Sequence, residues 1–94
     1  MTFQNKTLEE AFHRQGGLCA YCGKELVWAS TQSGERGAWH SHHRKAIVHG
    51  GTDFLGNCVL LCINLPEECH LQIGHGGSYQ DNMVLHDKDL PYLL

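Results

Sequence analysis

No apolar run in this sequence approaches the roughly 18 residues that a membrane-spanning helix needs, so we expect a soluble protein. The start of the chain also lacks the apolar core of a secretory signal peptide, because residues 2–14 are polar and mixed in charge. The five cysteines leave one over from any full set of disulfides. These absences argue against an extracellular disulfide framework and favour reduced thiolates that bind zinc in a reducing, cytoplasmic compartment.

An excess of positive charge is also lacking. Seven Lys and Arg residues against ten Asp and Glu residues give a formal net charge of −3, which argues against a nucleic-acid partner because phosphate contacts usually come from Lys and Arg. Local placement matters more than the total, and Arg44 and Lys45 directly follow a pair of histidines. We predict that they contact phosphates of DNA, against the alternative of solvated charges beside a turn.

The length of the chain suffices for one domain, residues 1–94, and no internal repeat, linker or low-complexity tract divides it. A chain this short has a modest core and is often marginally stable without a staple. The five cysteines and eight histidines indicate that metal ions supply that staple. We therefore expect a small, zinc-stapled α+β domain.

Apolar periodicity and turn residues predict short elements of secondary structure. A Thr-x-x-Glu capping box starts the first helix, and Pro66 with two acidic residues in the first turn starts the second. Glycines follow both helices, a polar surface loop is expected over residues 30–37, and a glycine turn over residues 50–53. The predicted elements are a helix over residues 7–15, strands over 25–29, 38–43 and 58–61, and a helix over 66–73.

A C-x-x-C-G motif at residues 19–23 has the form of a zinc knuckle, whose tight turn aims both sulfurs at one point. Cys62 and Cys69 supply two further ligands if the segment between them folds into a wide knuckle, with Cys58 as a competitor for Cys62. Redox pairs share the C-x-x-C spacing, but no strand-helix-strand pattern surrounds it here. The structural zinc ligands that we predict are Cys19, Cys22, Cys62 and Cys69.

A second constellation consists of His42 and His43, then Asn57, then His70 directly after Cys69. A metal-dependent nuclease needs a base that activates water and ligands that hold a cation beside a phosphate, and this constellation offers both. A lone histidine is more often a surface residue or a satisfied core residue than a ligand. The histidines that we interpret in this ordinary way are His13, His40, His49 and His86.

From residue 18 to residue 77 the chain resembles the HNH endonucleases of the ββα-metal type. The motifs that carry the resemblance are C-x-x-C at residues 19–22, the histidine pair, the glycine turn, and residues 57–62 and 69–77. The resemblance implies a zinc-stapled, treble-clef-like ββα-metal core that cleaves DNA, preceded here by the N-terminal helix. The Ser-His-His opening also looks like that of small HNH-type toxin domains of bacterial competition, which would be delivered into target cells and neutralised by an immunity protein.

The resemblance also implies a role for each residue. His43 resembles the general base that takes a proton from the attacking water, and Asn57 resembles the residue that holds the loop carrying His43. His42 and His70 resemble the ligands of one divalent cation that stabilises the leaving 3′ oxygen. His75 is a further candidate ligand, although on a continuous α-helix it would point about 140° away from His70 unless Gly74 breaks the helix.

Two further expectations concern the ion and the strand. Imidazole ligands without a carboxylate favour Mn²⁺, Ni²⁺, Co²⁺ or Zn²⁺ over Mg²⁺, which is the abundant ion. Because His42 and His43 are neighbours on a strand and face opposite ways, both can serve one phosphate only if the strand ends there. The alternative from another functional class is a non-catalytic zinc module that binds nucleic acid or protein.

Overall fold

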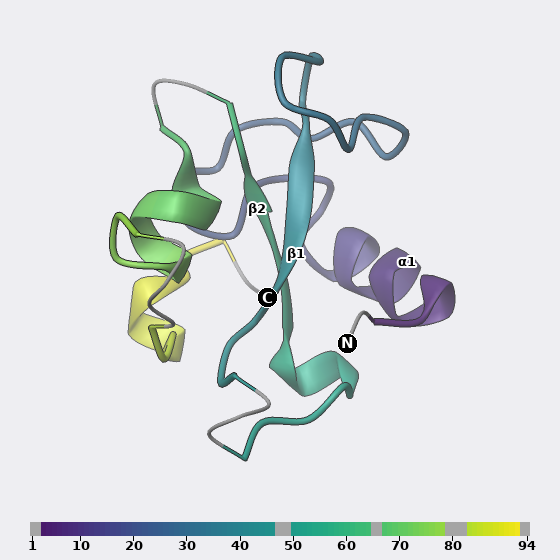
Figure 1. Cartoon of the computed structure of the whole chain (residues 1–94). Helices are drawn as coiled ribbons and strands as arrows, with labels where there is room; N and C mark the ends of the chain where they lie inside the picture. The colour runs from purple at the N-terminus through teal and green to yellow at the C-terminus, as the bar shows by residue number, and fades with distance from the viewer. Residues whose placement is uncertain (1–2, 47–49, 65–66, 79–82, 93–94) are drawn as a thin grey trace.

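The computed structural model describes residues 3–46, 50–64, 67–78 and 83–92 (Figure 1). It has the α+β fold that the sequence predicts, with a helix before an antiparallel two-stranded sheet. Among the described residues, no helix is long and apolar enough to cross a membrane. In chain order the elements are α1 (Asn5–Arg14), β1 (Trp39–His43), η2 (Leu55–Asn57), β2 (Cys58–Cys62), η3 (His70–Gly74) and η4 (Asp87–Asp89).

Helix α1 begins at Asn5, two residues before the predicted start, and its N-cap Gln4 makes no side-chain cap hydrogen bond. The predicted capping box was therefore wrong, because Thr7 lies inside the helix. Phe3 is buried in the core and Leu8 packs against that core, which are the two positions of a hydrophobic staple. Burial of Phe3, rather than a polar cap, sets where the chain enters the helix. The helix ends before two glycines with positive φ, as predicted.

Strands β1 and β2 form the hairpin at the centre of the fold (Figure 1). They pair antiparallel, with Trp39 opposite Cys62 and His43 opposite Cys58. All five residues of β2 are buried, whereas β1 alternates between buried and more exposed positions. The predicted strands over residues 38–43 and 58–61 are confirmed, and β1 ends at His43.

The predicted strand over residues 25–29 was wrong. Only an isolated bridge between Leu18 and Glu25 forms there. The backbone of this segment is used by other partners, because the Leu26 N–H donates to the carbonyl of Gly17 and the indole N–H of Trp39 donates to the carbonyl of Val27. The segment therefore wraps the buried Trp39 instead of extending the sheet.

The second helix also starts later than predicted. Pro66, the predicted first residue, lies outside the described residues. Glu68 has a φ of 39°, which an α-helix does not permit, so helical structure begins only at Cys69. The segment His70–Gly74 is a π-helix rather than an α-helix.

The free edge of β2 is covered by a side chain of the residue that follows α1. Gln15 is buried, its amide nitrogen donates to the carbonyl of Leu60 at 3.0 Å, and its amide oxygen accepts the Leu60 N–H at 2.8 Å. These two bonds replace those of a third strand. Leu85 and Leu90 of the C-terminal segment complete the core on the described part of the chain.

Candidate metal sites and active site

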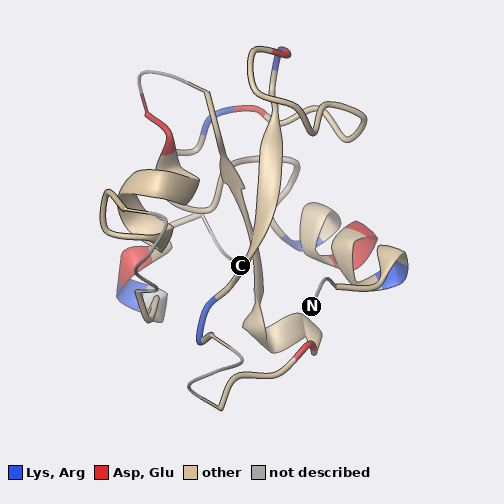
Figure 2. Ribbon diagram, in the orientation of Figure 1, with Lys and Arg blue, Asp and Glu red and all other residues tan. Residues whose placement is uncertain are grey.

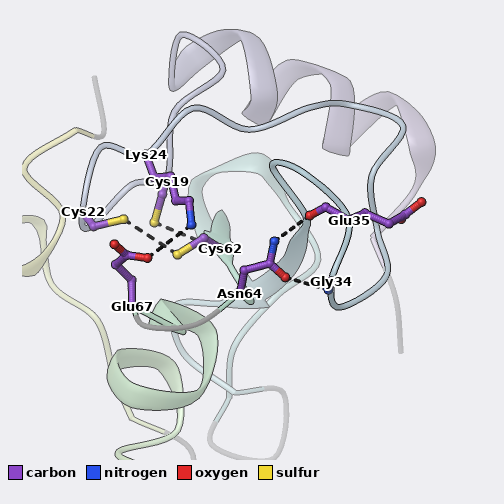
Figure 3. A network of polar contacts seen from close by, with 8 residues as sticks. All are labelled: Cys19, Cys22, Lys24, Gly34, Glu35, Cys62, Asn64 and Glu67. Carbon is purple, nitrogen blue, oxygen red and sulfur yellow. Dashed lines mark hydrogen bonds and ion pairs between the residues drawn. The ribbon is translucent and has the colours of Figure 1, made fainter.

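The four cysteines of the predicted zinc site lie together. Their sulfurs are all within 4.8 Å of one another, and the sulfurs of Cys22 and Cys62 are 3.7 Å apart (Figure 3). A tetrahedral zinc ion with Zn–S bonds of about 2.3 Å places its sulfur ligands about 3.8 Å apart. The arrangement therefore fits one zinc ion. Cys58, the competitor for Cys62, does not belong to this group.

The C-x-x-C turn is built by its own backbone. The Gly23 N–H donates to the carbonyl of Cys19 at 3.0 Å, and the Cys19 N–H donates to the carbonyl of Lys24 at 2.8 Å. Gly23 has a φ of 76°, and a Cβ there would lie 2.4 Å from the ring of Tyr92. Glycine is thus required both by the turn and by the close approach of the C-terminal segment.

Polar contacts join the C-x-x-C knuckle at residues 19–24 to residues 62–67 after the hairpin (Figure 3). The Lys24 ammonium lies 3.2 Å from the Glu67 carboxylate, and the Cys62 N–H donates to the sulfur of Cys19 at 3.5 Å. The side-chain oxygen of Asn64 accepts the Gly34 N–H, and its side-chain nitrogen donates to the carbonyl of Glu35. Asn64 thereby fixes the surface loop over residues 30–37. The site is therefore supported by bonds from three separate segments.

The thiols of Cys19, Cys62 and Cys69 share protons. Hydrogen bonds from Cys62 and Cys69 lower the pKa of Cys19, and the hydrogen bonds with Cys19 raise the pKa of Cys62 to about 12 and the pKa of Cys69 as well. One thiolate thus forms easily, and the next is opposed by the first. A divalent cation relieves this opposition, because thiolates are the form that binds zinc. Burial alone raises the pKa of Cys58 to about 12, so that thiol stays protonated.

Three histidines form a second group. One ring nitrogen from each of His42, His70 and His75 lies within 4.8 Å of the others, and the Nε2 atoms of His70 and His75 are 3.2 Å apart. Imidazole ligands at about 2.0–2.1 Å from a tetrahedral ion lie about 3.3 Å from each other. We call these three residues the histidine trio. It contains the two predicted ligands of the catalytic ion together with the further candidate, His75.

The π-helix explains how His75 joins the trio. Its wider turn changes the direction of the side chains relative to an α-helix, and the rings of His70 and His75 lie with centroids 4.7 Å apart. The expected divergence of these two side chains assumed α-helical geometry. The helix also ends at Gly74, and His75 follows it as the C-cap residue with a φ of −122°. The break at Gly74 that the sequence suggested is therefore present.

The ring of His42 is positioned by a hydrogen bond with Met83 and by close contact with Gly74. Its ring makes a hydrogen bond with the backbone of Met83, and its buried Nε2 has no hydrogen-bond partner among the described residues. A Cβ on Gly74 would lie 3.1 Å from the ring, so glycine leaves the space that the imidazole occupies. Burial and then the neighbouring histidines lower the pKa of His42 to about 4 and that of His70 to about 3. Both rings are neutral at pH 7, which is the form that binds a metal ion.

His43 lies in different surroundings. Its Nε2 is 2.7 Å from Oδ1 of Asp53, and its ring stacks on Phe3 with centroids 4.1 Å apart. Asp53 was not predicted as a site residue. The sequence places it in the glycine turn, and only the register of the hairpin brings that turn back beside the end of β1.

Asn57 binds the backbone at two places. Its side-chain oxygen accepts the Lys45 N–H at 2.8 Å, and its amide nitrogen donates to the carbonyls of Lys45 at 2.9 Å and Thr52 at 2.7 Å. The backbone of Asn57 also accepts the Arg44 N–H at 2.8 Å. One side chain thus joins the chain just after His43 to the chain just before Asp53.

The two basic residues after β1 differ in their surroundings. The side chain of Lys45 is exposed, whereas Nε of the half-buried Arg44 donates to the carbonyl of Leu85 at 3.1 Å. Figure 2 shows this basic stretch directly after β1, and shows acidic and basic residues mixed elsewhere along the described chain. The local positive charge therefore lies next to the histidines, as the sequence indicates.

A family model described as HNH endonuclease matches residues 19–76. Comparison with curated proteins and with solved structures gave no match. The matched segment covers more than half of the 94 residues and includes both the four-cysteine group and the histidine trio. The chain therefore belongs to the HNH endonuclease family.

Proposed function

We propose that this domain is a metal-dependent endonuclease that hydrolyses phosphodiester bonds in DNA. Membership of the HNH family supports a nuclease-type function in general. The observation that carries the specific proposal is the convergence of His42, His70 and His75 beside the end of the strand that carries His43.

In this proposal His43 is the general base. Its Nε2 is engaged with Asp53, so Nδ1 is the nitrogen that takes a proton from the attacking water. The histidine trio holds one divalent cation, which when bound stabilises negative charge on the phosphate and on the leaving 3′ oxygen. The product then carries a 5′-phosphate. The scissile phosphate is required to lie across the end of β1, because His42 and His43 face opposite sides of that strand.

The remaining predicted residues take supporting roles. Asn57 holds the loop after His43 through its three side-chain bonds to the backbone. Lys45, whose side chain is exposed, is proposed to contact a phosphate of the DNA, and Arg44 to contribute positive charge from beside it. These contacts supply local attraction that the net charge of −3 does not.

The four cysteines are proposed to hold a structural zinc ion. Cys69 belongs to the four-cysteine group and the adjacent His70 to the histidine trio, so the sulfur serves zinc while the imidazole serves the second ion. Zinc at Cys19, Cys22, Cys62 and Cys69 joins the knuckle before the hairpin to the π-helix after it. The position of His70 thus depends on the zinc site.

The proposal is tested by cleavage of supercoiled plasmid with purified protein. The protein is first treated with EDTA to remove the ion of the histidine trio, and Mn²⁺, Ni²⁺ or Mg²⁺ is then added. We expect His43→Ala to slow cleavage by about 100-fold or more, because a general base typically contributes about 10²–10⁴-fold. The matched control is His86→Ala, which changes an exposed histidine. Both variants should keep wild-type zinc content and melting temperature. Absence of cleavage by the wild type, or full activity of His43→Ala, contradicts the proposal.

The same assay separates the alternatives. A non-catalytic zinc module would bind DNA or protein equally well in the wild type and in His43→Ala, with no metal-dependent cleavage by either. A thiol redox protein would form a reversible disulfide between Cys19 and Cys22, and stoichiometric zinc in the purified protein contradicts it. A toxin domain would stop the growth of a host that expresses it without a neutralising immunity protein.

A further inference from the structure

We propose that Asp53 is a positioning residue for His43, and that its carboxylate fixes the tautomer and the orientation of the base. This inference rests on the proposed nuclease function and deepens it. Neither the motif at residues 42–43 nor the predicted metal ligands include Asp53.

The contact between the two side chains is short and partly shielded. Nε2 of His43 lies 2.7 Å from Oδ1 of Asp53, and the two side chains are 18% and 35% exposed. An ionised carboxylate accepts hydrogen bonds and donates none, so the ring must present its N–H at Nε2. A neutral imidazole carries one N–H, which leaves the lone pair at Nδ1. The geometry therefore selects the tautomer that can take a proton from water through Nδ1.

The frame around the pair holds both partners. The ring of the buried Phe3 stacks on His43 with an interplanar angle of 24°, which restricts tilting of the imidazole. Asn57 bonds the carbonyl of Thr52, directly before Asp53, and both backbone groups of Lys45, two residues after His43. One amide side chain thus sets the distance between the loop of the base and the loop of its carboxylate.

Gly51 permits this approach of the two loops. A Cβ at Gly51 would lie 1.8 Å from the carbonyl oxygen of Lys45, so no other residue fits there without a backbone shift. The Gly51 N–H donates to the carbonyl of Ala46 at 2.9 Å. The turn is therefore packed directly onto the chain that leaves β1, and Asp53 returns to His43 as a result.

Asp53 serves His43 and not the ion. It is absent from the histidine trio, whose members are imidazoles alone. Without the carboxylate, the His43 ring can adopt either tautomer and can rotate about its Cβ–Cγ bond. A ring that presents N–H toward the water cannot accept a proton, and a carboxylate beside the ring also stabilises the imidazolium that forms.

The test compares Asp53→Asn and Asp53→Ala with Asp89→Asn as a matched control. Asp89 is a carboxylate that accepts a backbone N–H, from His86 at 3.1 Å, in the C-terminal segment. Steady-state cleavage of a duplex oligonucleotide is measured at saturating Mn²⁺ with the zinc-loaded protein. We expect kcat of both Asp53 variants to fall by about 10–100-fold, the usual effect of removing an orienting partner. KM and the Mn²⁺ affinity should stay at the values of the control.

Two further measurements distinguish positioning from a purely structural role. In the His43→Ala background, Asp53→Ala should cause no additional loss, because the carboxylate acts only through His43. Nitrogen-15 NMR of the zinc-loaded, manganese-free protein should show the Nε2–H tautomer of His43 in the wild type and a mixture of tautomers in Asp53→Ala. A structural role would lower the melting temperature without changing the tautomer.

The possible failures separate cleanly. If the wild type cleaves, His43→Ala is inactive and Asp53→Asn stays within threefold of Asp89→Asn, the inference about Asp53 is overturned and the nuclease proposal stands. An additional loss from Asp53→Ala in the His43→Ala background also overturns the inference. If neither the wild type nor Asp89→Asn cleaves, the nuclease proposal itself is overturned.

Discussion

Replacement of Gly74 by alanine tests whether the histidine trio holds the catalytic ion. Gly74 ends the π-helix between His70 and His75, and its backbone φ is outside the left-handed region, so alanine introduces no backbone strain. The new Cβ would lie 3.1 Å from both Cε1 and Nδ1 of His42. Carbon atoms in good contact are about 3.5–4.0 Å apart, so the imidazole must retreat by about 0.4 Å or more.

The consequences for stability and for metal binding differ in size. Overpacking of a buried site costs about 1–3 kcal/mol, and the better helix propensity of alanine returns up to about 1 kcal/mol. The net loss of unfolding free energy should therefore be about 0–3 kcal/mol. Metal–ligand distances tolerate deviations of only about 0.2 Å, so the same shift of the His42 ring should weaken metal binding. We expect the Mn²⁺ affinity to fall by about 10–100-fold, comparable to the loss of a partner that orients a ligand.

The assay is a Mn²⁺ titration of zinc-loaded protein followed by electron paramagnetic resonance, together with plasmid cleavage across the same Mn²⁺ range. Gly56→Ala is the matched control, because a Cβ at Gly56 has no neighbouring atom within 4 Å. Gly74→Ala should need more Mn²⁺ for cleavage and recover at saturating concentration. Equal Mn²⁺ affinity of the two variants would refute the reasoning that His42 binds the ion from its observed position.

Two other predictions concern the zinc site and the loop of the base. Cys62→Ser should lower the zinc content and the melting temperature, whereas Cys58→Ser should keep one zinc per chain by atomic absorption, because Cys58 lies outside the four-sulfur group; equal zinc loss in both variants contradicts this assignment. Asn57→Ala removes three side-chain hydrogen bonds, each of which contributes about 1 kcal/mol at most because water can replace it. Thermal unfolding should therefore show a loss of about 1–3 kcal/mol in the free energy of unfolding, and cleavage should be slower. Unchanged cleavage would show that the loop holds His43 without Asn57.

Local patterns in the sequence predicted the hairpin and the groups of side chains that could hold metal ions. A run such as Cys58–Cys62 has few alternatives to a buried strand, and the alternation in Trp39–His43 sets which histidine faces which side. The cysteines at residues 19, 22, 62 and 69 were separable from Cys58 only by spacing, and the structure brings those four together. Short motifs of cysteine and histidine can be interpreted from the sequence because few other arrangements bring several such side chains together.

The features that the sequence did not reveal depend on contacts between distant segments. The start of α1 follows from the burial of Phe3, which competes with a polar cap two residues later. Residues 25–29 look like a strand, but their backbone groups form hydrogen bonds with Gly17, Gly37 and the indole of Trp39 instead of with another strand. The π-helix at His70–Gly74 and the pairing of Asp53 with His43 also need the assembled hairpin. Propensity and periodicity describe single segments and do not contain these partners.

The adjacency of Cys69 and His70 implies an order in which the two ions load. In the proposed metal-loaded protein, zinc fixes Cys69 and with it the five-residue π-helix that carries His70, which is too short to be stable alone. Under the proposed function, zinc would therefore bind first, and the second ion would enter a site whose ligands are already in place. Under the proposed function, oxidation of one of the four cysteines would thus stop cleavage without any chemical change to the histidine trio.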